Sequence, residues 1–183
     1  MRRALILVIF LTAIGGVVLI TDSSASSGLR YDETVPDDLR ALADETWNDF
    51  LAAHPGQWEC ISPPKLQADW DLESRGEYRP GSETVIVRVP GTPATLRSEL
   101  IHEFAHHVEF TCAEHHELRP DFLRAQGFAP TATWDEADSW ENTPAEQYAE
   151  ATVELIEGRR THPGGIQITP EAIDVIREWG FGS

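Results

Sequence analysis

The organisation of this chain depends on one stretch, TVIVRVPGTPATLRSELIHEFAHHVEF, which spans residues 84–110. Its first part, 84–89, is rich in β-branched residues and predicts a strand. A Pro-Gly pair ends that strand, and Thr92 followed by Pro93 is a typical helix start. Apolar residues then recur every three or four positions, which predicts an amphipathic helix to about Phe110. We therefore expect a strand that leads into a long helix.

This helix contains an H-E-x-x-H sequence. His102 and His106 are four residues apart, so both imidazoles can reach one ion. Glu103 lies on the adjoining flank, where it can take a proton from a metal-bound water without being a ligand. Zinc lowers the pKa of such a water to about 7. The motif predicts one Zn²⁺ ion held by the two histidines, with Glu103 as the catalytic base.

A catalytic zinc site needs a third protein ligand and one open position. The short motif H-E-x-x-H-x-x-G-x-x-H is excluded, because Glu109 and Cys112 stand where it needs Gly and His. The best candidate lies in PAEQYAEA, residues 144–151, where Glu146 and Glu150 share one face of an expected helix. We expect Glu146 to bind the metal and Glu150 to accept a hydrogen bond from a ligand histidine.

An H-E-x-x-H helix followed by a helix with E-x-x-A-E resembles the gluzincin branch of the zincin metallopeptidases. The E-Q-Y-A-E-A string is similar to the corresponding helix of anthrax lethal factor. The resemblance covers residues 92–151, about a third of the chain, and implies a zincin fold, a single zinc ion and hydrolysis of peptide bonds. It carries over the ligands His102, His106 and Glu146, the base Glu103 and the supporting carboxylate Glu150.

One element of that family is missing. Such enzymes use a Tyr or His to stabilise the tetrahedral oxyanion, a role worth about 3 kcal/mol of barrier. Neither residue type stands just upstream of Glu146. Tyr148 is about 200° around the helix from Glu146, so we expect it to point away. The remaining candidates, which nothing else in the sequence supports, are His115, His116 and His162.

The segment 130–142, just before Glu146, predicts a polar loop. Its acidic run 135–138 is a solvated loop, an alternative source of the third ligand, or the rim of a cleft that favours basic substrates. Trp134 and Trp140 are expected to form a wall that faces the substrate, while the other tryptophans are expected in the core. We expect solvated positions for the polar residues Glu99, Glu109, His115 and His116.

The rest of the chain is mostly helical by its periodicity. We expect helices over about 37–53, 143–156 and 170–179, one or two helical turns at 121–125, and short extended pieces around 65–72. Thr143 and Glu146 have the spacing of a capping box. The expected class is α+β: a small zincin-like domain, mostly helical, with a short sheet preceding the H-E-x-x-H helix.

Residues 1–27 have the pattern of a signal peptide or N-terminal anchor with a short tether. Met1-Arg2-Arg3 is positively charged, 4–20 is apolar and uncharged, and Ser23-Ser24-Ala25 is a plausible cleavage site. We expect cleavage because Gly15-Gly16 weakens a spanning helix; the alternative is an uncleaved anchor. Residues 28–183 then form a single domain that is secreted or extracytoplasmic. In such a compartment Cys60 and Cys112 predict a disulfide, with two buried free thiols as the alternative.

The charge narrows the function. A formal net charge of −17 argues against nucleic acid and anionic lipid as partners, leaving no expected membrane binding beyond the possible anchor. We therefore expect an exported zinc metallopeptidase acting on a peptide or protein. One alternative is a zincin-like zinc-binding domain with a non-catalytic recognition role, and another is a structural exported domain without metal.

Overall fold

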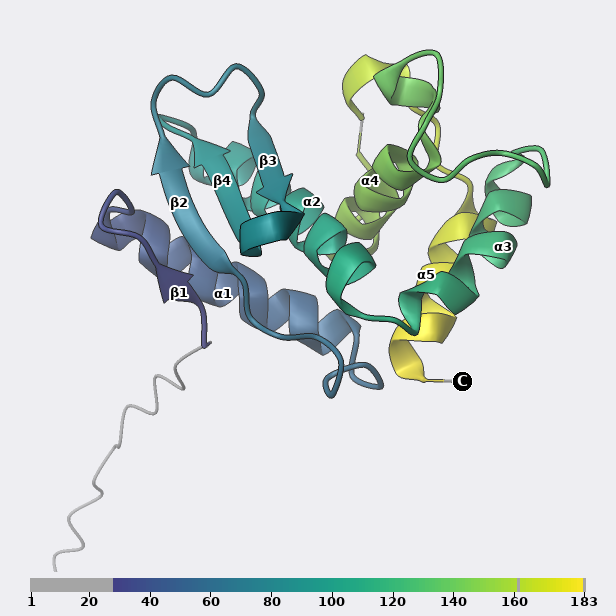
Figure 1. Ribbon diagram of the computed structural model, residues 1–183, viewed down its shortest axis with the longest axis horizontal. Coiled ribbons are helices and arrows are strands. Elements are labelled where there is room, and N and C mark those ends of the chain that lie inside the picture. The colour runs from purple at the N-terminus through teal and green to yellow at the C-terminus, as the bar shows by residue number, and fades with distance from the viewer. Residues whose placement is uncertain (1–27, 161, 183) are drawn as a thin grey trace, which may run out of the picture.

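The structure is a computed structural model that describes residues 28–160 and 162–182, so the expected signal or anchor at 1–27 lies outside the described residues. It confirms the α+β class (Figure 1). The helices are α1 (Asp37–Ala53), α2 (Pro93–Thr111), α3 (His115–Gln126), α4 (Pro144–Glu157) and α5 (Pro170–Phe181). The strands are β1 (Arg30–Tyr31), β2 (Lys65–Asp69), β3 (Gly76–Arg79) and β4 (Thr84–Arg88).

The four strands form one sheet in the order β1-β2-β4-β3. β1, β2 and β4 are parallel, whereas β3 pairs antiparallel with β4 and lies at the edge of the sheet. Strand β4 is buried except for Arg88, as a central strand covered on both faces must be. Neither β1 nor β3 was expected, because β1 has two residues and the sequence of β3, GEYR, contains no β-branched residue.

Helix α2 is central to the molecule: the sheet and α1 lie on one side of it, and α3, α4 and α5 on the other (Figure 1). It begins as expected, with the Thr92 hydroxyl accepting a hydrogen bond from the Thr95 N–H at 3.2 Å. Phe104 packs its ring against Trp47 and Phe50 of α1, with centroid distances of 4.8 and 5.8 Å. Burying such a ring stabilises the fold by about 2 kcal/mol, so this contact fixes α2 on α1.

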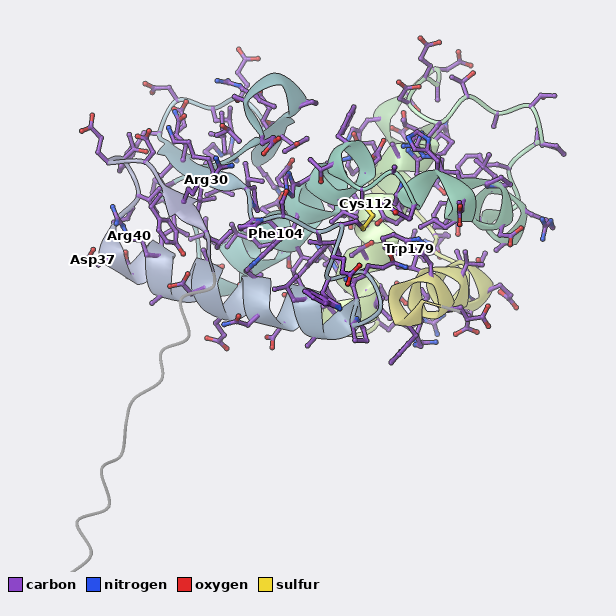
Figure 2. All side chains as sticks on the ribbon, turned by 60° about the horizontal axis from the view of Figure 1, so that its bottom comes forward. Arg30, Asp37, Arg40, Phe104, Cys112 and Trp179 are labelled. Atoms are coloured by element: carbon purple, nitrogen blue, oxygen red, sulfur yellow. A yellow bond between two sulfur atoms is a disulfide. The ribbon has the colours of Figure 1, made fainter. Side chains whose placement is uncertain are left out.

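The Cys60–Cys112 disulfide is present (Figure 2), which confirms the expected pairing. It joins the loop after α1 to the residue that caps the C-terminus of α2. The bond spans 52 residues, and closing a loop of that size stabilises the folded state by about 4 kcal/mol on the chain-entropy model. The end of α2 that follows the H-E-x-x-H motif is therefore covalently held.

Helix α3 is longer than the expected one or two turns, and it begins inside the expected loop. His115, Leu118 and Phe122 share its buried face. The expectation of a solvated His115 was wrong, since its ring packs 4.5 Å from that of Tyr148, while His116 is exposed as expected. Pro120 inside the helix explains why the sequence pattern missed its extent. Within the described part of the chain, no helix has both the length and the apolarity that a membrane crossing requires.

Candidate metal centre

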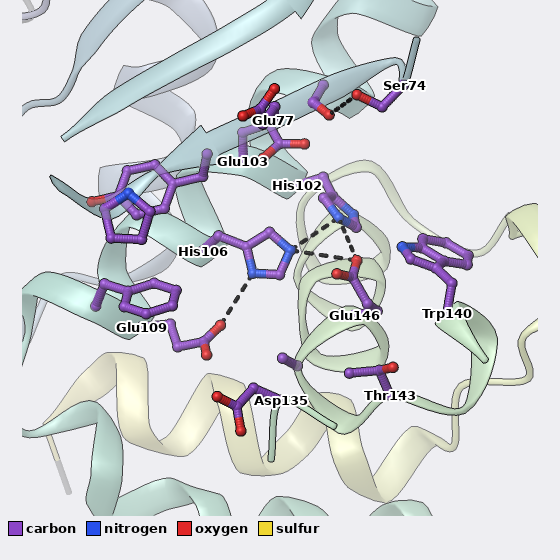
Figure 3. A pocket seen from close by; sticks show the side chains of 15 residues that line it. Ser74, Glu77, His102, Glu103, His106, Glu109, Asp135, Trp140, Thr143 and Glu146 are labelled. Atoms are coloured by element: carbon purple, nitrogen blue, oxygen red, sulfur yellow. Dashed lines mark hydrogen bonds and ion pairs between the residues drawn. The ribbon is translucent and has the colours of Figure 1, made fainter. Parts of the chain in front are cut away.

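The three expected ligands converge between α2 and α4 (Figure 3). His102 Nε2 lies 3.1 Å from Glu146 Oε2, His106 Nε2 lies 3.5 Å from the same oxygen, and the two nitrogens are 3.2 Å apart. Atoms bound at 2.0–2.1 Å to one tetrahedral zinc ion lie about 3.3 Å apart. The triangle of these atoms therefore has the size that a single Zn²⁺ ion requires, and the group could hold a metal ion.

Glu146 does not close the expected capping box. No side chain caps the N-terminus of α4, and the Thr143 hydroxyl donates to the Ser139 carbonyl at 3.0 Å. Burial raises the pKa of Glu146, but its hydrogen bonds to His102 and His106 outweigh that effect and hold the pKa well below its ordinary value. Glu146 is therefore an anionic side chain directed at the imidazole pair rather than a helix cap.

Each imidazole has a second carboxylate on its other ring nitrogen. His102 Nδ1 lies 3.2 Å from Glu150 Oε1, an ion-pair distance at an angle outside that of a hydrogen bond. His106 Nδ1 lies 3.1 Å from Glu109 Oε2. Carboxylates in these positions fix the tautomer and orientation of ligand histidines. The structure thus places Glu150 where the sequence predicted, and adds Glu109, which the sequence did not assign to the site.

The expectations of a solvated Glu109 and a substrate-facing Trp134 were both wrong. Glu109 is only 3% exposed and accepts a hydrogen bond from the Trp134 indole N–H at 2.7 Å. Trp134 is itself buried and packs against Phe122 of α3. The sequence did contain a signal, because Glu109 follows His106 by three residues and so lies on the same face of α2. Its burial comes from α3 and the loop after it, which helical spacing cannot reveal.

Glu103 is buried beside strand β3. It is 4% exposed, and burial raises the pKa of its carboxyl above the ordinary value. A Cβ atom at position 76 would lie 2.4 Å from Glu103 Oε1, so only glycine permits this close approach. Gly76 of the edge strand therefore makes room for the carboxylate that the motif assigns as the base.

The ligand group and Glu103 line a cleft of about 460 Å³. Tyr78 of β3 and Phe110 of α2 contribute its aromatic side, and Asp135 from the acidic run also lines it. Within the described chain, the acidic run contributes no side chain to the metal-binding group, so its role as the third-ligand source is not supported. Asp135 instead lies at the lower side of the view in Figure 3, consistent with a cleft rim.

Trp140 lines the cleft, as expected for a substrate-facing wall. It begins the short 3₁₀ helix Trp140–Asn142 that precedes α4. Its ring lies nearly parallel to that of His102, with centroids 6.3 Å apart and 21° between the planes. Figure 3 shows its indole nitrogen on the side that faces His102 and Glu146. Trp140 is thus a cleft residue that carries an N–H donor.

The histidines considered as oxyanion donors lie elsewhere. Of the described residues that line the cleft, none is His115, His116 or His162, and Tyr148 is buried in the core. Tyr78 does line the cleft, but its hydroxyl is already bonded. His107 donates Nε2–H to the Ser62 carbonyl at 2.6 Å, which leaves Nδ1 of the neutral ring to accept the Tyr78 O–H at 3.1 Å.

The comparisons with known proteins identify no family. No protein-family model, no curated protein and no solved structure matches this chain. The zincin-like fold and the gluzincin affiliation therefore stay predictions. What the structure supplies is the geometry of one His-His-Glu group beside a buried carboxylate in an open cleft.

Proposed function

We propose that this chain is an exported zinc-dependent metallopeptidase that uses Glu103 as its general base. The observation that carries the proposal is the set of three ligand atoms, 3.1 to 3.5 Å apart, at the wall of an open cleft. Three protein ligands with one open side are typical of catalytic zinc, whereas structural zinc has four. The two histidines and Glu146 would hold the ion.

The surrounding residues suit hydrolysis of a peptide bond. A bound zinc ion would supply a water of lowered pKa and a Lewis acid. Glu103 takes the proton of the attacking water and delivers it to the leaving amine, and the raised pKa of its buried carboxyl suits a proton shuttle near neutral pH. Strand β3 ends the described sheet and lines the cleft, so its outer edge can pair with an extended peptide.

Trp140 is the oxyanion donor in this proposal. The change Trp140→Phe keeps an aromatic ring and removes the indole N–H, so we expect kcat to fall by about 100-fold. Zinc affinity should stay close to that of the original protein, because Trp140 is not a ligand. The control is Trp70→Phe, since Trp70 is exposed and lies away from the cleft. An unchanged kcat in Trp140→Phe would remove the indole from the mechanism.

Removing the metal tests the function itself. We expect the purified protein to contain one zinc ion per chain, and a chelator should abolish its hydrolysis of a mixed peptide library. Added Zn²⁺ should restore the hydrolysis, whereas His106→Ala should bind little zinc and show no turnover. Metal analysis and mass spectrometry of the products provide both measurements. A protein that lacks zinc and does not take it up would contradict the proposal.

The second candidate function is a zinc-binding recognition domain without turnover. The observation that favours it is the cleft itself, in which the hydroxyl of Tyr78 is occupied by His107. This alternative predicts one bound zinc ion together with an intact peptide library. The two candidates therefore differ in the product analysis and agree in the metal analysis.

A further inference from the structure

A buried row of alternating acidic and basic groups lies behind His102. His162 stands between two carboxylates of α4: its Nδ1 lies 2.6 Å from Glu150 Oε2, and its Nε2 lies 2.7 Å from Glu154 Oε2. The ring is 5% exposed. The other oxygen of Glu150 faces His102 Nδ1. The row thus runs from the proposed metal ligand through Glu150 and His162 to Glu154.

The geometry sets the charge of His162. A neutral imidazole has one N–H, so one of its nitrogens would present a lone pair to a carboxylate oxygen less than 3 Å away. An imidazolium instead donates to both carboxylates. Burial disfavours this charge, but the hydrogen bonds to Glu150 and Glu154 outweigh burial and raise the pKa of His162 above its ordinary value.

Glu150 cannot hold its own position. It leaves α4 toward both His102 and His162, and burial would favour its neutral form. Its contacts with these two rings outweigh burial and lower its pKa to about 2. His162 therefore keeps Glu150 ionised and fixes one of its oxygens, so that the other remains against His102. Glu154 anchors the far side of His162, and Arg159 lies 3.8 Å from Glu154.

We propose that His162 is a positioning residue for the metal centre, a buried imidazolium that holds Glu150 against the ligand His102. This inference rests on the metal site of the proposed function. His162 itself is kept away from the cleft by Glu150 and α4. It acts on the ion only through the orientation and basicity of His102, as outer partners of ligand histidines do.

Zinc affinity tests the proposal. The change His162→Gln removes the cation, and we expect the dissociation constant for Zn²⁺ to rise by about 10- to 100-fold in a competitive titration. The control is His116→Gln, the same change at an exposed histidine outside the site, which should leave the constant unchanged. Glu154→Gln keeps a side-chain acceptor for Nε2–H and should weaken binding less than His162→Gln. The visible spectrum of the Co²⁺-loaded protein should shift in His162→Gln, because it reports the ligand geometry directly.

A second measurement needs no variant and so holds even if His162→Gln fails to fold. Nitrogen-15 NMR of the full chain at pH 7 should show protons on both ring nitrogens of His162. Equal zinc affinities and Co²⁺ spectra for His162→Gln and the original protein, or a neutral His162 ring, would overturn the inference while leaving the metallopeptidase proposal intact. A full chain that binds neither Zn²⁺ nor Co²⁺ would instead overturn both.

Discussion

Replacing Glu103 by Gln is expected to lower kcat for peptide hydrolysis by about 10²- to 10⁴-fold while the protein still binds one zinc ion. Gln has the shape of Glu and fits the same buried position beside Gly76, but it cannot accept a proton from water. Glu103 is not a member of the His-His-Glu group, so the ligand set stays complete. The measurement combines steady-state kinetics on a cleaved peptide with metal analysis of the same sample.

Glu99→Gln is the matched control for this experiment. Glu99 stands one turn earlier on the same helix, pairs with Arg75 at 3.5 Å and lies outside the cleft lining. It should therefore keep both zinc and turnover. Full activity in Glu103→Gln would exclude the general-base role. Loss of zinc in that variant would show that Glu103 is a ligand, which would also contradict the mechanism.

Glu146→Ala is expected to weaken zinc binding by more than the 100-fold that marks the upper range for partners outside the ligand set. The change removes the only anion from the three ligands and leaves two neutral imidazoles to hold a divalent ion. It also removes the carboxylate that now contacts both His102 and His106. A competitive titration with a chromophoric chelator measures the loss.

Asp138→Ala provides the comparison, because it makes the same change in charge. Asp138 belongs to the acidic run before α4, is exposed and does not line the cleft. In a chain with a formal net charge of −17, any acidic residue attracts cations at long range, and this control subtracts that general effect. Equal losses in the two variants would mean that Glu146 is not the third ligand.

The approach of α4 to α2 joins these predictions. The H-E-x-x-H helix alone supplies two imidazoles and a base, and each ligand histidine needs a carboxylate to orient it. Glu109 does this for His106 from within α2, whereas Glu150 does it for His102 from α4. The two ligand histidines are therefore oriented by different parts of the chain, and damage at His162 should affect His102 more than His106.

Local spacing was enough to predict the parts of the site that lie on single helices. His102 and His106 are one turn apart, and so are Glu146 and Glu150, because a helix repeats every 3.6 residues whatever surrounds it. The Thr-Pro start of α2 and the strand at 84–88 also follow from local preferences. The alternatives between Glu146 and the acidic run stayed open, because spacing within a helix does not tell which distant segment packs against it.

What only the tertiary structure decided is the environment of each polar group. Strand β3 forms because β4 pairs with it, although its own residues have weak strand preference. Glu109 and His115 were expected in solvent and are buried, because α3 and Trp134 cover them. The burial of a charged side chain depends on a partner that offsets its desolvation. Here those partners lie far along the sequence: Trp134 for Glu109, and His162 for Glu150. The sequence by itself thus determined which side chains share a helix face, and packing determined which of them face the cleft, the core or the proposed ion.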